Sequence, residues 1–127
     1  MTTKSIPRLR KSVHFNTRLS DRVTKMLRDY AARYRVSPSA AAAQILEEGL
    51  RMEHFPGIDF RPTVCGREPF VTGTGLTVWE MFHIWRDHKE EIRGVLRNYP
   101  HLKPVQINAA VAYAKAFPRE EPPDAWA

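Results

Sequence analysis

The stretch Val13-His14-Phe15-Asn16-Thr17-Arg18-Leu19 has a two-residue period. Its odd positions fall on one side and are mostly apolar, whereas its even positions fall on the other side and are polar: Val13, Phe15, Thr17 and Leu19 against His14, Asn16 and Arg18. Successive side chains of an extended strand point to opposite faces, so this alternation predicts a half-buried strand.

Two helices are expected after this strand. Ser20 or Asp21 caps the first, whose apolar residues recur at steps of three and four: Val23, Met26, Leu27, Tyr30, Ala31 and Tyr34. It is expected to end near Arg35. The pair Ser37-Pro38 marks a restart, because proline is favoured at the first helical position, and the second helix is expected to run to about Met52.

One strand with two helices buries too little surface and cannot pair its own strand. We therefore expect a homodimer, or a higher oligomer built from dimers, in which two copies of the strand pair antiparallel. Its core would hold Val13, Phe15 and Leu19. The outward residues His14, Asn16 and Arg18 would face solvent on a ribbon that fits the major groove of double-stranded DNA and could read base edges there. The alternative for these three residues is an ordinary exposed strand face, and for His14 a further alternative is contact with phosphate or water only.

The charge distribution supports a polyanionic partner. Of the 127 residues, 1–54 hold 11 Lys and Arg against 5 Asp and Glu, a net charge of +6, whereas residues 55–127 hold 9 of each. A basic segment beside a neutral one is typical of a nucleic-acid-binding module joined to something else. A basic arm over residues 1–10, with Arg8, Arg10 and the following Lys11, would contact phosphates. The alternatives are that the charge serves solubility alone and that the arm is simply a disordered start.

The strand pattern, the amphipathic helix and the Ser37-Pro38-Ser39 restart resemble the ribbon–helix–helix DNA-binding fold of bacterial repressors and VapB-type antitoxins. The resemblance covers about 40 residues within 11–54, and it departs from the pattern at Thr17, where a larger apolar residue is usual. It implies base reading by His14, Asn16 and Arg18. It also implies a phosphate clamp around Ser37 and Ser39, which the positive end of a helix favours independently.

The second half has a different organisation. Residues 55–62 contain two prolines and a glycine and are interpreted as a linker. Residues 63–118 are expected to form a short strand over 69–72 and helices over about 77–86, 88–98 and 104–117. Residues 119–127 form an acidic, proline-rich tail in which Trp126 has no obvious core to join, so we expect it to bind a partner.

This second unit resembles a small uncharacterised domain family found in antitoxin-like proteins. The matching residues are Gly66, Pro69, Phe70-Val71, Gly73-Thr74, Val78-Trp79, Tyr99-Pro100-His101-Leu102 and Ala109–Tyr113. The resemblance implies a three-helix, helix-turn-helix-like fold and a neighbouring toxin of nuclease type. The helix over 104–117 is apolar nearly all round, which indicates packing rather than base reading.

No pattern in the sequence indicates catalysis, a cofactor or a metal site. Gly73-Thr74-Gly75 lacks the third glycine of a dinucleotide fingerprint, and Cys65 has no activating context. Glu80, His83 and Asp87 have a spacing that could hold a metal, but a solvated helix face is favoured. Trp79, Phe82 and Trp85 are expected in the core rather than on a stacking platform. Glu90 and Glu91 are the least implausible catalytic carboxylates, and their exposed position argues against that role.

The sequence therefore predicts a mainly α-helical, non-enzymatic, cytoplasmic protein without a membrane span: a homodimeric regulator that binds its own promoter and neutralises a nuclease-type toxin. Two alternatives stay open. One is a stand-alone repressor or nucleoid-type DNA-binding protein without a toxin, and the other is a protein-interaction module with no DNA role.

Overall fold

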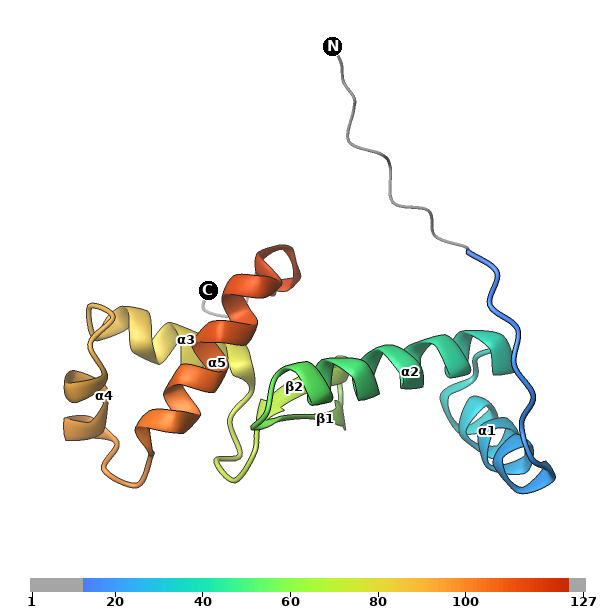
Figure 1. The fold of residues 1–127 in the computed structure, drawn as a ribbon. Helices are drawn as coiled ribbons and strands as arrows, with labels where there is room; N and C mark the ends of the chain where they lie inside the picture. Colours follow the sequence, from blue (N-terminus) through green and yellow to red (C-terminus); the bar gives the residue numbers. More distant parts are fainter. Residues whose placement is uncertain (1–12, 124–127) are drawn as a thin grey trace, which may run out of the picture. The chain divides into compact units, whose positions relative to one another are not determined.

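A computed structural model describes residues 13–123. These residues form a mainly helical structure with five α-helices and one antiparallel sheet of two strands (Figure 1). By its contacts the chain divides into two compact units, residues 1–42 and 43–127, and each is described by itself. Among the described residues, none of the helices has the length and apolar character needed to cross a membrane.

The first unit contains helix α1 (Asp21–Tyr34) and the beginning of α2 (Pro38–His54). Ser20 caps α1, since its hydroxyl accepts a hydrogen bond from the Val23 N–H at 3.1 Å. Arg35 ends the helix in a left-handed conformation, with φ of 57°. Both helix starts and the end near Arg35 confirm the sequence prediction.

The expected strand over residues 13–19 is absent from the single chain. Residues 13–20 belong to no helix or strand in the structure. A strand exists only through hydrogen bonds to a neighbour, and no other strand lies within the described part of the first unit. The single chain therefore does not contain the predicted strand, and the ribbon, which needs a second copy, stays a prediction.

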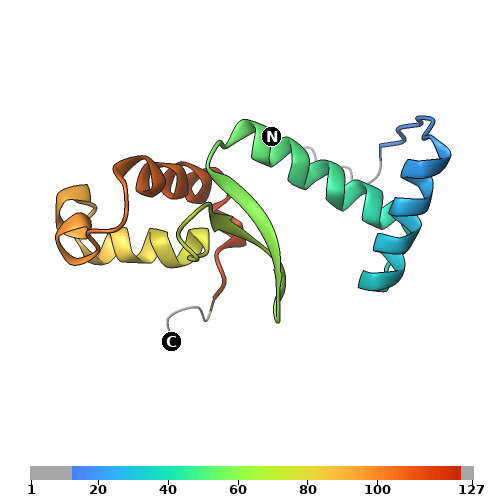
Figure 2. The same cartoon turned by 90° about the horizontal axis from the view of Figure 1, so that it is seen from below.

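The second unit begins with the remainder of α2 and continues into a hairpin of β1 (Ile58–Thr63) and β2 (Gly66–Val71). Ile58 pairs with Val71 and Thr63 with Gly66, and Figure 2 shows the two strands running side by side along a curve. The linker predicted over 55–62 is thus wrong from Ile58 onward. Pro62 is compatible with β1 because each strand of a two-stranded sheet has a free edge, where a missing N–H breaks no ladder bond.

Three helices follow the hairpin: α3 (Val78–Asp87), α4 (Ile92–Asn98) and α5 (Pro104–Ala116). Thr77 and Glu80 form a capping box at the start of α3. The middle helix begins later than the predicted residue 88, because Lys89 and Glu90 adopt positive φ angles of 59° and 62° that no α-helix continues through. These elements establish a hairpin and three helices. They do not establish the expected helix-turn-helix-like arrangement.

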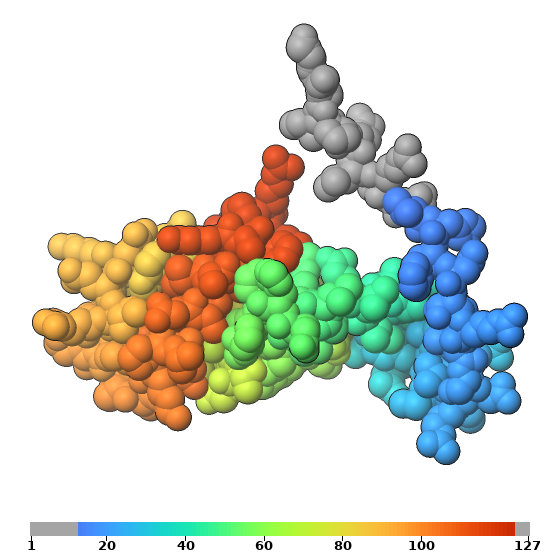
Figure 3. All heavy atoms as spheres, viewed as in Figure 1, coloured from blue at the N-terminus to red at the C-terminus, as the bar shows by residue number. Residues whose placement is uncertain are grey.

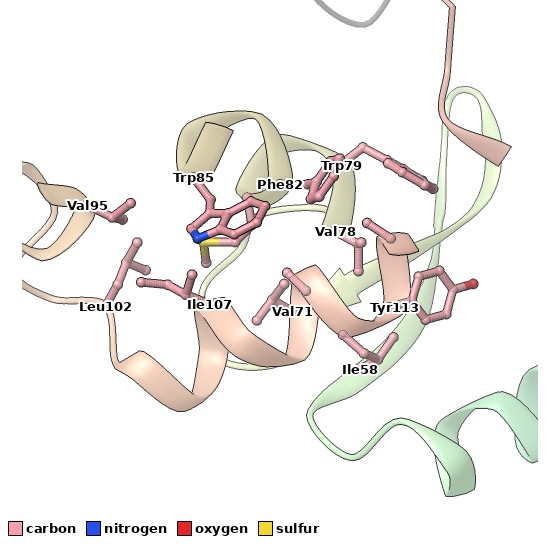
Figure 4. Packing of buried hydrophobic residues seen from close by; sticks show 13 residues of the cluster. Ile58, Val71, Val78, Trp79, Phe82, Trp85, Val95, Leu102, Ile107 and Tyr113 are labelled. Carbon is pink, nitrogen blue, oxygen red and sulfur yellow. The ribbon is translucent and has the colours of Figure 1, made fainter. Parts of the chain in front are cut away.

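One hydrophobic core holds the second unit together. It is formed by buried residues of the hairpin and all three helices (Figure 4). Tyr113, Met81 and Ile107 are among its fully buried residues. Trp79, Phe82 and Trp85 are 4, 8 and 8% exposed, so their predicted place in the core is confirmed. The apolar character of α5 is explained in the same way, since Ile107, Ala110, Tyr113 and Ala114 all belong to this core.

Candidate nucleic-acid interface

The three residues predicted to read bases lie on the irregular segment before α1. His14, Asn16 and Arg18 are all exposed. Because the segment is not a strand in the single chain, the structure does not place them on one shared face. Arg8, Arg10 and Lys11, the predicted phosphate contacts of the arm, lie outside the described residues.

The predicted dimer core is open to solvent in the single chain. Phe15 is 77% exposed, Val13 74% and Leu19 46%, and Met26 on α1 is 63% exposed. The only described residues of the first unit that are buried are Ala31 and Ala41. The first unit therefore has more large apolar side chains than its own residues can bury.

The start of α2 is organised by Ser37. Its hydroxyl accepts a hydrogen bond from the Ala40 N–H at 3.1 Å, and its carbonyl accepts one from the Ala41 N–H at 2.9 Å. Pro38 has no N–H to offer. In this first turn, the backbone N–H of Ser39 therefore remains without a hydrogen-bond partner among the described residues. Ser37 shapes the predicted phosphate clamp, and the Ser39 backbone is its available donor.

The first unit is electropositive where it is described. Residues 13–42 contain six Lys and Arg residues and two Asp residues, a net charge of +4. Lys25 and Asp29 form an exposed i,i+4 pair at 3.0 Å, and Asp21 lies in the first turn of α1, where the helix dipole favours it. Most of the positive charge is therefore unpaired with acidic side chains and available to a polyanion.

The second unit contains a cluster of charged residues that sequence reasoning missed. Arg51, in the last turn of α2, donates from Nη1 to the Tyr113 hydroxyl at 2.7 Å and to Oε1 of Glu120 at 2.8 Å. From Nη2 it donates to Oε2 of Glu120 at 2.9 Å and to Glu47. Its guanidinium carbon lies 3.7 Å from the centre of the Phe117 ring.

The pKa values of this cluster reflect its geometry. The hydrogen bond to Glu120 raises the pKa of Arg51, outweighing the opposing effect of burial. Burial raises the pKa of Tyr113, although the hydrogen bond and charge of Arg51 act in the opposite direction. Arg51 is therefore a permanent cation, with a neutral phenol oxygen as one of its acceptors.

A second ion pair lies beside the first. Arg67 on β2 donates to both oxygens of Glu48 on α2, at 2.7 and 3.1 Å, and Gln44 donates to Glu48 at 3.2 Å. The two pairs border an open hollow of about 260 Å³ that Phe60 and Pro69 also line. Its carboxylates and guanidinium groups already bind one another. No motif could have revealed these contacts, because Arg51 is 62 residues from Tyr113 and 69 from Glu120.

The remaining residues considered in the sequence analysis are Glu80 and His83 as metal ligands, Cys65 and Trp126. Glu80 accepts the Thr77 N–H at 2.8 Å, whereas Nε2 of His83 lies 2.6 Å from Oε2 of Glu121. These two residues thus serve different contacts, and the described residues include no group of three side chains placed to bind a metal. Cys65 is exposed in the turn between β1 and β2. Trp126 lies outside the described residues.

The structure corrects the prediction for the acidic tail. Residues Pro118–Glu120 form a short 3₁₀ helix, η1, and Glu121 follows it. Glu120 and Glu121 bind Arg51, His83 and Arg86 of the same chain, so they are not free acidic groups. The sequence did not indicate these contacts, because the prolines and charges of the tail carry no local sign of partners far away along the chain.

Comparison with known proteins finds a family match for part of the chain. No curated protein and no solved structure is similar enough to match the chain. The segment from β1 to the last turns of α5, residues 58–114, matches the model of a family described as protein of unknown function, DUF433.

Proposed function

We propose that the chain is a homodimeric, DNA-binding transcriptional regulator of the ribbon–helix–helix type. One observation carries the proposal: residues 13–42 expose large apolar side chains and bury only two alanines among the described positions. A segment of this size cannot be stable with its apolar stripe in water. A second copy is the occupant that fits, since the same pattern supplies a strand that needs a strand partner and symmetric dimers are the commonest assemblies.

Binding to DNA follows from what such a dimer would expose. Pairing through Val13, Phe15 and Leu19 turns His14, Asn16 and Arg18 to the opposite face of the ribbon, because neighbouring side chains alternate. A two-stranded ribbon fits the major groove, where Arg and Asn match guanine and adenine edges. The net charge of +6 on residues 1–54 of each copy supplies the attraction to phosphates.

The test is fluorescence anisotropy of the full chain on DNA from upstream of its own gene, at several salt concentrations. If each copy contacts about three to four phosphates, the slope of log affinity against log salt should be about −5 to −7. Arg18→Gln should weaken binding, whereas Arg93→Gln, the same charge change at an exposed site on α4, should not. Salt-independent binding, or equal losses in both variants, would reject the proposal.

A further part of the proposal is that this regulator is the antitoxin of a type II pair, with a nuclease-type toxin bound by residues 55–127. Its support is the resemblance of both halves to antitoxin-associated families, and its alternative is a stand-alone repressor. The product of the neighbouring gene should co-purify with the full chain, and Trp126→Ala should weaken that capture. Capture that fails while promoter binding persists would favour the stand-alone repressor.

A further inference from the structure

The C-terminal turn is tied to two helices by its two glutamates. Both oxygens of Glu120 accept hydrogen bonds from Arg51 in α2, and Oε2 of Glu121 lies 2.6 Å from His83 and 3.4 Å from Arg86, both in α3. In Figure 3 the orange-red end of α5 lies against the green end of α2. Residues 118–121 therefore join α2 to α3 through side chains.

The receiving site around Arg51 is held in place by groups other than Glu120. The Tyr113 hydroxyl, the Phe117 ring and Glu47 each contact the guanidinium, and the Arg51 side chain is 16% exposed. A planar guanidinium fixed in this way presents two parallel N–H donors, which match the two oxygens of one carboxylate. The site is thus shaped to receive the Glu120 carboxylate in addition to that of Glu47.

The occupant is held mainly by the side chains of its two glutamates. The Glu120 side chain is 47% exposed, and its turn has only two backbone hydrogen bonds of its own, Glu120 N–H to Phe117 at 3.0 Å and Glu121 N–H to Pro118 at 3.4 Å. Segments with few buried contacts and few backbone bonds open at low free-energy cost. Partly exposed ion pairs contribute little to stability, so a segment held mainly by such pairs can leave a site that other groups keep in shape.

We propose that Arg51 is the centre of a carboxylate-binding site whose occupant, residues 118–121, is an acidic strap that opens and closes. When closed, the strap fixes the last turn of α2 against α5. When open, it releases that turn and makes the Arg51 donors that now bind Glu120 available to an acidic segment of the same chemistry. The strap is independent of DNA binding, since every contact in it belongs to the second unit.

Hydrogen exchange of the full chain tests the strap. The double variant Glu120→Gln/Glu121→Gln should exchange roughly tenfold faster than the unmodified chain at two places, the amides of residues 117–121 and those of 51–55. Arg119→Gln is the matched control, because it changes one exposed charge in the same turn and should leave both places unchanged. Faster exchange confined to 117–121, or an equal effect of the control, would overturn the strap.

A peptide supplied in trans tests the carboxylate site itself. The peptide with the sequence of residues 116–123, at the millimolar concentrations that replace a tethered contact, should restore slow exchange at 51–55 in the double variant. The same peptide with glutamine at both glutamate positions should not, and neither should the acidic peptide once Arg51→Gln is added to the chain. Restoration by both peptides, or by neither, would show that Arg51 is not an exchangeable carboxylate site.

Discussion

Replacing Phe15 by alanine should weaken the proposed dimer by an amount that the structure allows to be worked out. Phe15 is 77% exposed in the single chain, so about three quarters of its side chain remains to be buried by a partner. Complete burial of a phenylalanine side chain stabilises by about 1.5–3 kcal/mol. Each copy should therefore lose about 1–2 kcal/mol, and the dimer, with two copies of the change, about 2–4 kcal/mol.

Sedimentation equilibrium at several protein concentrations measures this loss as a change in the dimer Kd. Since 1.4 kcal/mol corresponds to a factor of ten, the Kd should rise between about 30-fold and several hundred-fold. Val64→Ala is the control, because Val64 is 104% exposed in the turn of the hairpin and should not contribute to the dimer. An unchanged Kd for Phe15→Ala, or an unmodified chain that is folded and monomeric, would refute pairing through this segment.

Three further predictions concern base reading, pH and backbone strain. Asn16→Ala should cost about 1–3 kcal/mol of discrimination between the promoter and random DNA, and equal losses on both, measured by competition, would show that Asn16 does not read sequence. Burial raises the pKa of Asp59, but hydrogen bonds from Arg61 and Thr72 and the Arg61 charge lower it overall; its contribution to the free energy of unfolding is therefore present above about pH 4 and lost as the pH falls through the lowered pKa. Thr72→Val should reduce that loss in urea titrations at several pH values, and an identical pH dependence would contradict the assignment. Gly57→Ala should lower the free energy of unfolding by about 1–2 kcal/mol, because Gly57 has a φ of 94° and a Cβ there would lie 3.4 Å from that of Ala109; an unchanged urea midpoint would count against it.

Helix positions could be predicted because their signals are local. Ser20 and the Ser37-Pro38 pair specify where α1 and α2 begin, since caps act within one turn of the backbone. The apolar residues of α3 recur at helical spacing, and this alone indicated that Trp79, Phe82 and Trp85 face a core. Such features depend on residues three or four positions apart, which the sequence displays directly.

Strands and charged contacts depended on the tertiary structure. β1 was mistaken for a linker because Pro62 and Gly57 suggest irregular backbone, whereas the strand forms through its pairing with β2. The segment over 13–19 shows the reverse: its alternation is typical of a strand, yet it has none of the ladder bonds in the single chain. A strand is a property of two segments, so one segment's pattern does not settle it.

The sequence by itself determined the helices apart from the start of α4, the basic first half, and the apolar residues at helical and strand spacing within residues 13–42. Only the tertiary structure decided which charges are free. Glu120 and Glu121 look available in the sequence, but folding brings Arg51 and His83 to them. The physical reason is that an ion pair needs a separation of a few ångströms in space. Arg51 and Glu120 are 69 positions apart in the sequence, and neither residue type indicates where its partner lies.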